Sequence, residues 1–362
     1  MKGRENMKTK RITAILAAAT LVLGLTACAS GNKSNDNSSA KKDEEVTIGV
    51  YSGDWKTQID EAALQDFEEE TGIKVNIVEG ADAEWVSKVE AADGKNVPYD
   101  ILVLMPNSIR ELNEKGLLEN LDSDKISNIA DLYPSLLKEF ENEDGTYHAV
   151  PFAIGQLGLM YRADLVDTAP TSWSDLWNEE YKGHVAISPL TYTAGLQFFS
   201  GLLQTRSEDE VFADLAKLKD SVSSLPDSAG AVQTLIERGD AWVIPYWDGR
   251  AYSLKEQGLD VGFAYPTDGA VCAASNWVVL KNAPHLDNAY ELLNKILSPE
   301  SCKSFSEASY YGTANQKTEY SDDFLSKVQV GEEFYESLVW VDYDQVDQKL
   351  NDWVQKWQEA LN

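Results

Sequence analysis

The chain is poor in the residues and motifs on which most enzyme active sites depend. Its 362 residues include only three cysteines and three histidines, and the histidines are widely scattered. No CxxC, HExxH, GxSxG, P-loop or GxGxxG motif occurs. A zinc site needs clustered ligands, and nucleophilic catalysis needs a nucleophile beside a positioned base. We therefore expect a protein that is not an enzyme and that carries neither metal nor cofactor.

Positive charge is also scarce. Lysine and arginine number 31 against 60 aspartates and glutamates, which gives a formal net charge of −29. Such an acidic chain is a poor partner for nucleic acid and for anionic lipid headgroups. The charge does not identify a ligand, and we expect most of it to be solvated surface.

Only one long apolar run occurs, and it lies at the N-terminus. Residues 12–27 follow a segment with five basic residues and one acidic residue, and they are shorter than the roughly 20 residues of a membrane span. The run ends in Leu25-Thr26-Ala27-Cys28, which resembles the lipobox of bacterial lipoproteins. The resemblance implies a signal peptide over 1–27 and a lipid on the sulfur of Cys28. The alternative is an ordinary secretory signal in which Cys28 is incidental.

A polar segment follows the cleavage point. Residues 30–43 read SGNKSNDNSSAKKD and contain no apolar side chain larger than alanine. Such a segment cannot bury enough surface to offset its ordering entropy, so 28–44 is predicted to be a flexible tether. A lipid, a tether and a folded body together predict an extracytoplasmic protein that is lipid-anchored to the outer face of the cell membrane.

Two cysteines remain after the lipidation site. Cys272 and Cys302 could form one disulfide outside the cell, or they could be two buried free thiols. The sequence leaves both alternatives open.

Short apolar runs alternate with amphipathic segments through the first part of the body. Gly72 follows a segment with helical spacing as its predicted C-cap, and 99–105 is a predicted buried strand. The alternation of strands and helices indicates a parallel α/β layer. The predicted strands are 46–52, 73–80 and 99–105, and helices are predicted over 62–71, around 85–92 and from 109 to 116.

A second α/β series begins near residue 148. The stretch 148–162 is strand-like and is predicted to be broken by Pro151, Gly155 and Gly158. Two α/β units joined by extended crossings, with a ligand cleft between them, describe the whole pattern. The further predicted strands are 184–188, 241–247, 261–266 and 273–280, with helices over 172–177, 196–202, 231–237 and 286–297.

Several segments together resemble the spermidine/putrescine-binding proteins of bacterial polyamine ABC importers. The segments are ETGIKV (70–75), YDILVL (99–104), EKGLLENLD (114–122), AVPF (149–152), TSWSDLWNEEYKG (171–183), YPTDG (265–269) and VVLKNAPHLDNAYELLNKILSPE (278–300). The resemblance implies an α/β, two-lobed periplasmic-binding-protein type II fold. It implies lobe 1 over 45–153 plus 276–318, lobe 2 over 154–275 plus 319–362, and crossovers near 151–155 and 266–276.

The same resemblance implies part of a binding site. Family receptors hold ammonium groups with carboxylates and cover the stem of the polyamine with aromatic rings. Trp247 and Tyr311 match two of those aromatic positions, and Asp248 beside Trp247 could pair with an amine.

Other family positions depart from the polyamine pattern. Ala273 and Ser275 stand where the family has Trp-x-Asp, and Asn107 lies at the exit of the strand over 99–105. The acidic pair after the YKG strand is missing as well. Unpaired ammonium groups are costly in a closed cleft, so a neutral or zwitterionic solute suits the hydroxyl and amide groups here better than a polyamine does. These groups belong to Ser188, Thr191, Thr193, Ser275 and Asn276.

Several candidates have a structural alternative. Trp55, in the loop SGDW, could stack on the solute as a lid or pack between loop and helix. Trp247 could be core, Asp248 could hold a turn with Gly249, and Ser275 could satisfy strand backbone. Four further tryptophans are predicted to be structural, namely Trp277, Trp340, Trp353 and Trp357.

The sequence therefore predicts the solute-binding component of an ABC importer. We expect it to capture a small polar organic solute, polyamine-like or otherwise nitrogen-containing, by cleft closure and to deliver it to the permease subunits. We expect a monomer that does not bind nucleic acid. The alternative is a ferric-iron receptor of the same fold, suggested by the adjacent Tyr310 and Tyr311.

Overall fold

The computed structural model describes residues 45–361, which belong to one compact unit, Asp43–Asn362. The predicted signal peptide, the lipidation site Cys28 and the predicted tether lie outside the described residues.

Helices and strands alternate along the described chain. The strands are β1 (Glu45–Tyr51), β2 (Lys74–Gly80), β3 (Ile101–Leu104), β4 (Val150–Arg162), β5 (Val185–Ala186), β6 (Val222–Ser224), β7 (Val243–Trp247), β8 (Val261–Ala264), β9 (Val271–Val279) and β10 (Gly312–Thr313). The helices are α1 (Asp54–Ile59), α2 (Gln65–Thr71), α3 (Asp82–Ala92), α4 (Pro106–Glu114), α5 (Pro134–Leu137), α6 (Thr193–Leu202), α7 (Glu208–Leu218), α8 (Ala229–Arg238), α9 (Asp248–Glu256), α10 (Leu286–Ile296), α11 (Pro299–Ser309), α12 (Asp322–Leu325), α13 (Glu332–Glu336) and α14 (Tyr343–Leu361). Short π or 3-10 turns are η1 (Asp60–Leu64), η2 (Ser127–Asp131), η3 (Lys138–Phe140), η4 (Trp173–Trp177), η5 (Glu179–Tyr181) and η6 (Lys219–Ser221).

The strands form one mixed sheet in the order β2-β1-β3-β9-β4-β7-β5-β6, and β8 and β10 pair with β4. Strand β1 runs parallel to both β2 and β3, as the alternating pattern predicts. Strands β4 and β9 are antiparallel to their neighbours. The α/β fold class predicted from the sequence is confirmed.

Helix ends follow local sequence signals. Gly72 ends α2 in the left-handed region with a φ of 72°, where a side chain would be strained. Ser172 and Asp175 form a capping box at η4. A second capping box, between Ser207 and Glu210, begins α7, a helix that was not predicted.

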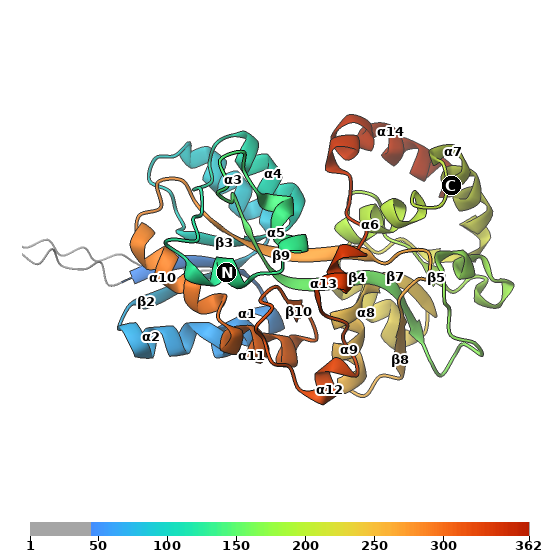
Figure 1. Cartoon of the computed structure of the whole chain (residues 1–362). Coiled ribbons are helices and arrows are strands. Elements are labelled where there is room, and N and C mark those ends of the chain that lie inside the picture. The colour runs from blue at the N-terminus through green and yellow to red at the C-terminus, as the bar shows by residue number, and fades with distance from the viewer. Residues whose placement is uncertain (1–44, 362) are drawn as a thin grey trace, which may run out of the picture. The chain divides into compact units, whose positions relative to one another are not determined.

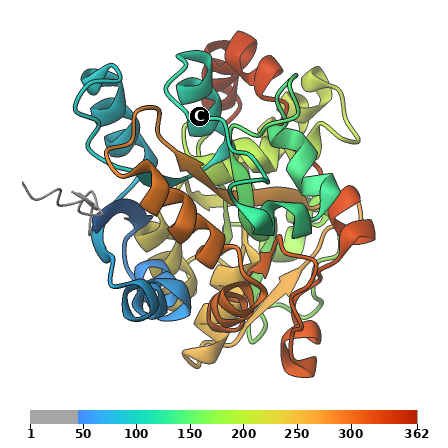
Figure 2. The ribbon, with the colours of Figure 1, turned by 60° about the vertical axis from the view of Figure 1, so that its left-hand side comes forward.

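The buried side chains form two separate cores, which we call the first and the second core. The first core packs residues from 46–154 and 272–338, and the second packs residues from 157–271 and 339–361. We call the segments around them the first and the second lobe. The lobe boundaries expected from the sequence stay a prediction. In Figure 1 the two groups of helices lie around the two ends of β4 and β9, and α11 packs against α1 in the first lobe (Figures 1 and 2).

Three segments pass side by side between the cores within the described chain. Strands β4 and β9 pair across this crossing, where Gly155 faces Ala273 and Gln156 faces Cys272. The third segment runs through Val339, whose carbonyl accepts a hydrogen bond of 2.7 Å from the amide of Cys272. Such adjacent, hydrogen-bonded crossings between two lobes are a suitable place for a hinge.

Strand β4 is continuous, so the breaks predicted at its proline and glycines were wrong. Its register with β9 shifts between Pro151 and Ala153, which absorbs the proline as a bulge. The glycines are needed for packing instead of for turns. A Cβ on Gly158 would lie 2.6 Å from the carbonyl of Ala264.

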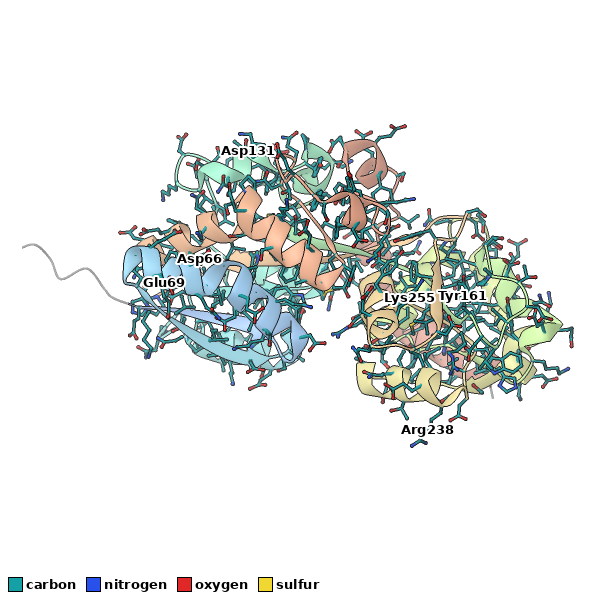
Figure 3. The ribbon with its side chains drawn as sticks, turned by 90° about the horizontal axis from the view of Figure 1, so that it is seen from below. Asp66, Glu69, Asp131, Tyr161, Arg238 and Lys255 are labelled. Atoms are coloured by element: carbon teal, nitrogen blue, oxygen red, sulfur yellow. The ribbon has the colours of Figure 1, made fainter. Side chains whose placement is uncertain are left out.

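Acidic side chains cover exposed helix faces. Figure 3 shows Asp66 and Glu69 on α2, and both are exposed. The ammonium group of Lys295 lies 4.0 Å from the Asp66 carboxylate and 2.8 Å from that of Glu70. This part of the negative charge, on α2, therefore lies on solvated surface.

Candidate functional site

A small pocket lies between the two lobes. Asp54, the first residue of α1, lines it from the first lobe, and residues of α8, β7 and α9 line it from the second. Its volume is about 50 Å³. The lining residues are Asp54, Ala229, Val232, Gln233, Tyr246, Arg250, Ser253, Leu254 and Gln257.

Arg250 is the basic side chain of this pocket. It stands in the first turn of α9 and is half-buried. The nearby Tyr311 hydroxyl raises the pKa of Arg250 most, and Tyr246, Asp54 and Tyr192 raise it further against the opposing effect of burial. Among residues 45–361 the guanidinium forms no salt bridge and no hydrogen bond.

Three tyrosines surround the guanidinium. The hydroxyls of Tyr192 and Tyr246 lie 3.5 Å apart. Burial raises the pKa of Tyr311 to about 12, although the positive charge of Arg250 acts in the opposite direction. Burial also raises the pKa values of Tyr192 and Tyr246, so all three hydroxyls stay protonated at neutral pH and can donate hydrogen bonds.

Asp248 is almost fully buried and is held by the backbone. Its Oδ1 accepts hydrogen bonds from the amides of Gln156 at 3.1 Å and Gly249 at 2.8 Å. Its Oδ2 lies 3.5 Å from the hydroxyl of Tyr265. Burial raises the pKa of Asp248 to about 7, while these hydrogen bonds act to lower it. The carboxylate thus joins β4 to the start of α9.

Tyr311 packs where α9 and β4 approach each other. A Cβ on Gly155 or on Gly249 would lie 2.6 Å from its ring. Only glycine therefore leaves room for the ring at both positions, one on β4 and one on α9. Tyr311 also packs against the first core, so its ring contacts both lobes.

Other predicted residues gather at the start of α6. Thr193 is its first residue, and Ser188 lies buried just before it with no hydrogen-bond partner for its hydroxyl in the described chain. Trp247 donates an indole hydrogen bond of 2.8 Å to Gln197 of α6. The ring of Tyr192 meets that of Trp247 edge-on at 5.9 Å. The structure thus brings Trp247 close to the start of α6.

The remaining predicted residues lie elsewhere. Trp55 is buried in the first core, where its ring centroid lies 5.1 Å from Phe305 and 5.7 Å from Trp277. Ser275 is half-buried on β9 beside the sulfur of Met105. Asn107 is exposed in the first turn of α4.

Asp54 and Arg250 were not predicted as site residues. Asp54 precedes Trp55, and Arg250 follows Asp248 by two positions, so each neighbours a residue that was predicted. The sequence offered only a weak signal for Arg250, which is that an arginine follows the end of a predicted strand by three positions in the stretch YWDGR (246–250).

A larger pocket of about 500 Å³ lies on the first lobe alone. It is formed by η2, α5 and α13, and Glu332 accepts two hydrogen bonds from Ser135 at its wall. Because no residue of the second lobe reaches it, movement of the lobes would not enclose a solute there. We therefore place the solute site at the smaller pocket.

The adjacent tyrosines stand beside positive charges. Lys327 lies 5.2 Å from the ring centroid of Tyr310, and Arg250 is close to Tyr311. Cations repel a ferric ion and do not complete its ligand set. Residues 45–361 contain no group of three or more His, Cys, Asp or Glu side chains arranged to hold a metal.

Comparison with known proteins identifies the family of this chain. The family model described as bacterial extracellular solute-binding protein matches residues 62–331, most of the chain. The chain belongs to this family. The spermidine/putrescine-binding periplasmic protein of Escherichia coli is 24% identical over 308 residues, 83% of each chain. The putrescine/agmatine-binding protein of Pseudomonas aeruginosa is 26% identical over 300 residues, 75% of this chain and 79% of that protein.

A solved structure shows the same fold. The spermidine/putrescine ABC transporter substrate-binding protein of Streptococcus pneumoniae superposes with a TM-score of 0.73 and 22% identity, over 88% of this chain and 100% of that one. The two-lobed periplasmic-binding-protein fold and the resemblance to the spermidine/putrescine-binding group are therefore confirmed for this solute-binding protein.

Two further features bear on the body of this solute-binding protein. Within the described part of the chain, every helix is too short or too polar to span a bilayer. Cys272 and Cys302 are both unpaired and buried, on β9 and α11 respectively. Burial raises the pKa of the Cys302 thiol to about 12, so it stays protonated and unreactive at neutral pH.

Proposed function

We propose that this chain is the lipid-anchored, extracytoplasmic receptor of an ABC importer. It captures a small polar organic solute, polyamine-like or otherwise nitrogen-containing, by closure of the two lobes and delivers it to the permease. The receptor acts as a monomer, since one chain supplies both walls of the site.

The pocket between the lobes carries this proposal. Asp54 comes from the first lobe, while Tyr246 and Arg250 come from the second. A solute that contacts both walls is bound more tightly when the lobes approach, so binding and closure are coupled. A volume of about 50 Å³ is far below the roughly 300 Å³ or more of ordinary ligand sites. We therefore expect the lobes to move apart before a solute enters.

Aromatic and hydroxyl side chains around the pocket suit a small organic solute. We propose that Trp247 and Tyr311 cover its stem and that Ser188 and Thr193 offer hydrogen bonds. Relatives named for spermidine, putrescine and agmatine support a solute that contains nitrogen. The predicted ligand-binding residues also include Ser275, Asn107 and Trp55. Asp248 is included because it lies beside Trp247.

A thermal-shift screen of residues 43–362 tests the receptor function. The compounds are spermidine, putrescine, amino acids, quaternary amines, thiamine and sugar phosphates. A solute that binds only the folded state raises the melting temperature, by an amount that grows with its concentration relative to Kd. We expect a shift with at least one compound. The absence of any shift at millimolar concentrations would contradict the proposal.

The lipid anchor is tested separately on the full chain. We expect labelled palmitate to be incorporated into the protein in membranes, and Cys28→Ser to abolish the label and release the protein. Cys272→Ser is the matched control, because its thiol is buried in the folded body. Label that persists in Cys28→Ser would refute the anchor.

A further inference from the structure

The pocket contains one basic and one acidic side chain on opposite walls. Arg250 projects from α9 in the second lobe, and Asp54 stands at the start of α1 in the first. In a chain with a net charge of −29, a guanidinium in this position is unexpected if the solute is a polyamine. A polyamine is a multiple cation, and a fixed positive charge beside it is repulsive.

Arg250 differs from the other half-buried arginines because no salt bridge to a carboxylate is formed by its guanidinium within the described chain. Arg162 pairs with Asp164 at 2.7 Å, and Arg206 pairs with Asp214 at 3.3 Å. Arg250 has no comparable partner among residues 45–361, and Asp54, which faces it across the pocket, forms no salt bridge with it. Asp54 acts on Arg250 only from across the pocket, and a partly desolvated guanidinium without a directly bonded anion is costly unless a ligand supplies that anion.

The groups around Arg250 can complete a site for oxygen anions. The hydroxyls of Tyr192, Tyr246 and Tyr311 lie near the guanidinium and are protonated donors. Ala229, the first residue of α8, lines the same pocket, so the positive end of this helix adds to the potential. A planar guanidinium binds carboxylate and phosphonate oxygens in pairs.

Asp248, the carboxylate that the sequence predicts as the partner of an amine, is already hydrogen-bonded within the protein. The Oδ1 of Asp248 accepts two backbone hydrogen bonds, and its carboxylate is buried. Two residues further along α9, Arg250 lines the pocket in its place. The side of the site formed by the second lobe is therefore basic.

We propose that the solute carries an anionic oxygen group, a carboxylate or a phosphonate, which binds to Arg250, and an ammonium group, which lies toward Asp54. This inference rests on the proposed receptor function and names its substrate class as zwitterionic amino acids of the ω-amino type. Polyamines are then disfavoured as cargo, because their second ammonium group would face the guanidinium.

Isothermal titration calorimetry on residues 43–362 tests the inference with matched solutes. The arms are 4-aminobutyrate, 2-aminoethylphosphonate, putrescine, inorganic phosphate and glucose 6-phosphate. Comparing the Kd values of 4-aminobutyrate and 2-aminoethylphosphonate separates a carboxylate from a phosphonate. In putrescine a second amine replaces the carboxylate of 4-aminobutyrate. We expect one or both amino acids to bind more tightly than putrescine.

Variants assign the effect to the two charges. We expect Arg250→Gln to raise the Kd of the amino acid that binds by at least about 30-fold. A loss of this size follows when one partner of a buried charge pair is removed. Arg250→Lys keeps the charge but loses the paired donors, so an intermediate loss is expected. Arg238→Gln is the matched control, because Arg238 is exposed at the end of α8, and it leaves affinity unchanged. Circular dichroism and the melting temperature of the unliganded variants check that they fold.

The remaining outcomes separate this inference from the receptor function. Putrescine binding more tightly than either amino acid, with Arg250→Gln leaving its affinity unchanged or higher, would overturn the inference and leave the receptor standing. Equal losses for every solute in Arg250→Gln and Asp54→Asn would assign the two residues to lobe closure and would also overturn it. Binding of only the amine-free phosphates, lost in Arg250→Gln, would support the anionic half and refute the amine. Binding of none of the compounds would overturn both proposals.

Discussion

The ring of Tyr311 lies directly against the α-carbon of Gly249, so that a Cβ at this position would be 2.6 Å from the ring. The same ring meets Gly155 of β4 equally closely. Tyr311 packs on the first core, whereas Gly249 is the second residue of α9 in the second lobe. The contact therefore couples the two lobes beside the pocket.

Gly249→Ala is expected to force this ring aside. Such overpacking costs about 1–3 kcal/mol, and urea denaturation measures the loss of unfolding free energy. The cost should fall in a Tyr311→Ala background, where the clash is absent. The matched control is Gly230→Ala in α8, which meets no neighbouring atom within 4 Å. A helix gains about 0.5–1 kcal/mol from that change, so equal losses at both positions would contradict the clash.

Asp248 is expected to make stability fall as pH rises. Its pKa is raised to about 7 in the folded protein, compared with about 3.9 in an unfolded chain. The folded state therefore binds more protons between pH 4 and 7, and its unfolding free energy decreases through that window. The full difference is about 4 kcal/mol.

Asp248→Asn keeps the shape and the carbonyl acceptor but does not titrate. Urea denaturation at pH 5 and pH 8 should show a smaller loss of stability in this variant than in the unmodified protein. Identical pH profiles for the two proteins would show that another group causes the change.

Glu208 is expected to stabilise the docking of α14 in a salt-dependent way. Its carboxylate lies 2.9 Å from the ammonium groups of both Lys349 and Lys356, which lower its pKa to about 2. Stability from this group is present above about pH 4.5 and is lost as pH falls toward 2. Because the site is partly exposed, Glu208→Gln should cost no more than about 1 kcal/mol. Repeating the denaturation in 1 M salt should reduce the difference, and a salt-independent loss would count against an ionic origin.

Trp55 is expected to act through packing. It is 6% exposed and contacts Phe152, Trp277 and Phe305 in the first core. Trp55→Ala should lower the unfolding free energy by about 3–5 kcal/mol. Leu225→Ala, at an exposed position, should change it by less than about 0.5 kcal/mol and serves as control. A stable Trp55→Ala variant that loses solute affinity would instead support the stacking alternative.

Much of the fold could be predicted because its signals are local. The buried run at 99–105 contains β3, and Gly72 ends α2 in the conformation that favours glycine. The missed helix α7 also had a local signal, since Ser207 and Glu210 form a capping box before the buried Val211. No local signal shows why β4 contains its two glycines. Gly155 leaves room for Tyr311 and Gly158 for Ala264, and both of these residues come from distant parts of the chain.

The site was less predictable for the same physical reason. Asp54 and Arg250 face one pocket only after the strands bring the two lobes together. In the sequence each is a charged residue near a helix start, where charges are usually solvated. Asp248 stays a predicted ligand group, and its hydrogen bond from the amide of Gln156 could not be predicted because β4 brings that amide to it from a distant part of the chain.

The second core includes Trp353 and Trp357 of α14, near the very end of the chain. Because α14 follows every other segment of this core in the sequence, the second lobe stays incomplete during synthesis until α14 has been made. Until then, the segments from residue 157 onward lack the apolar side chains of α14 that pack with them in the second core. We therefore expect the docking of this one helix to complete the second lobe, because it covers the last open part of the second core.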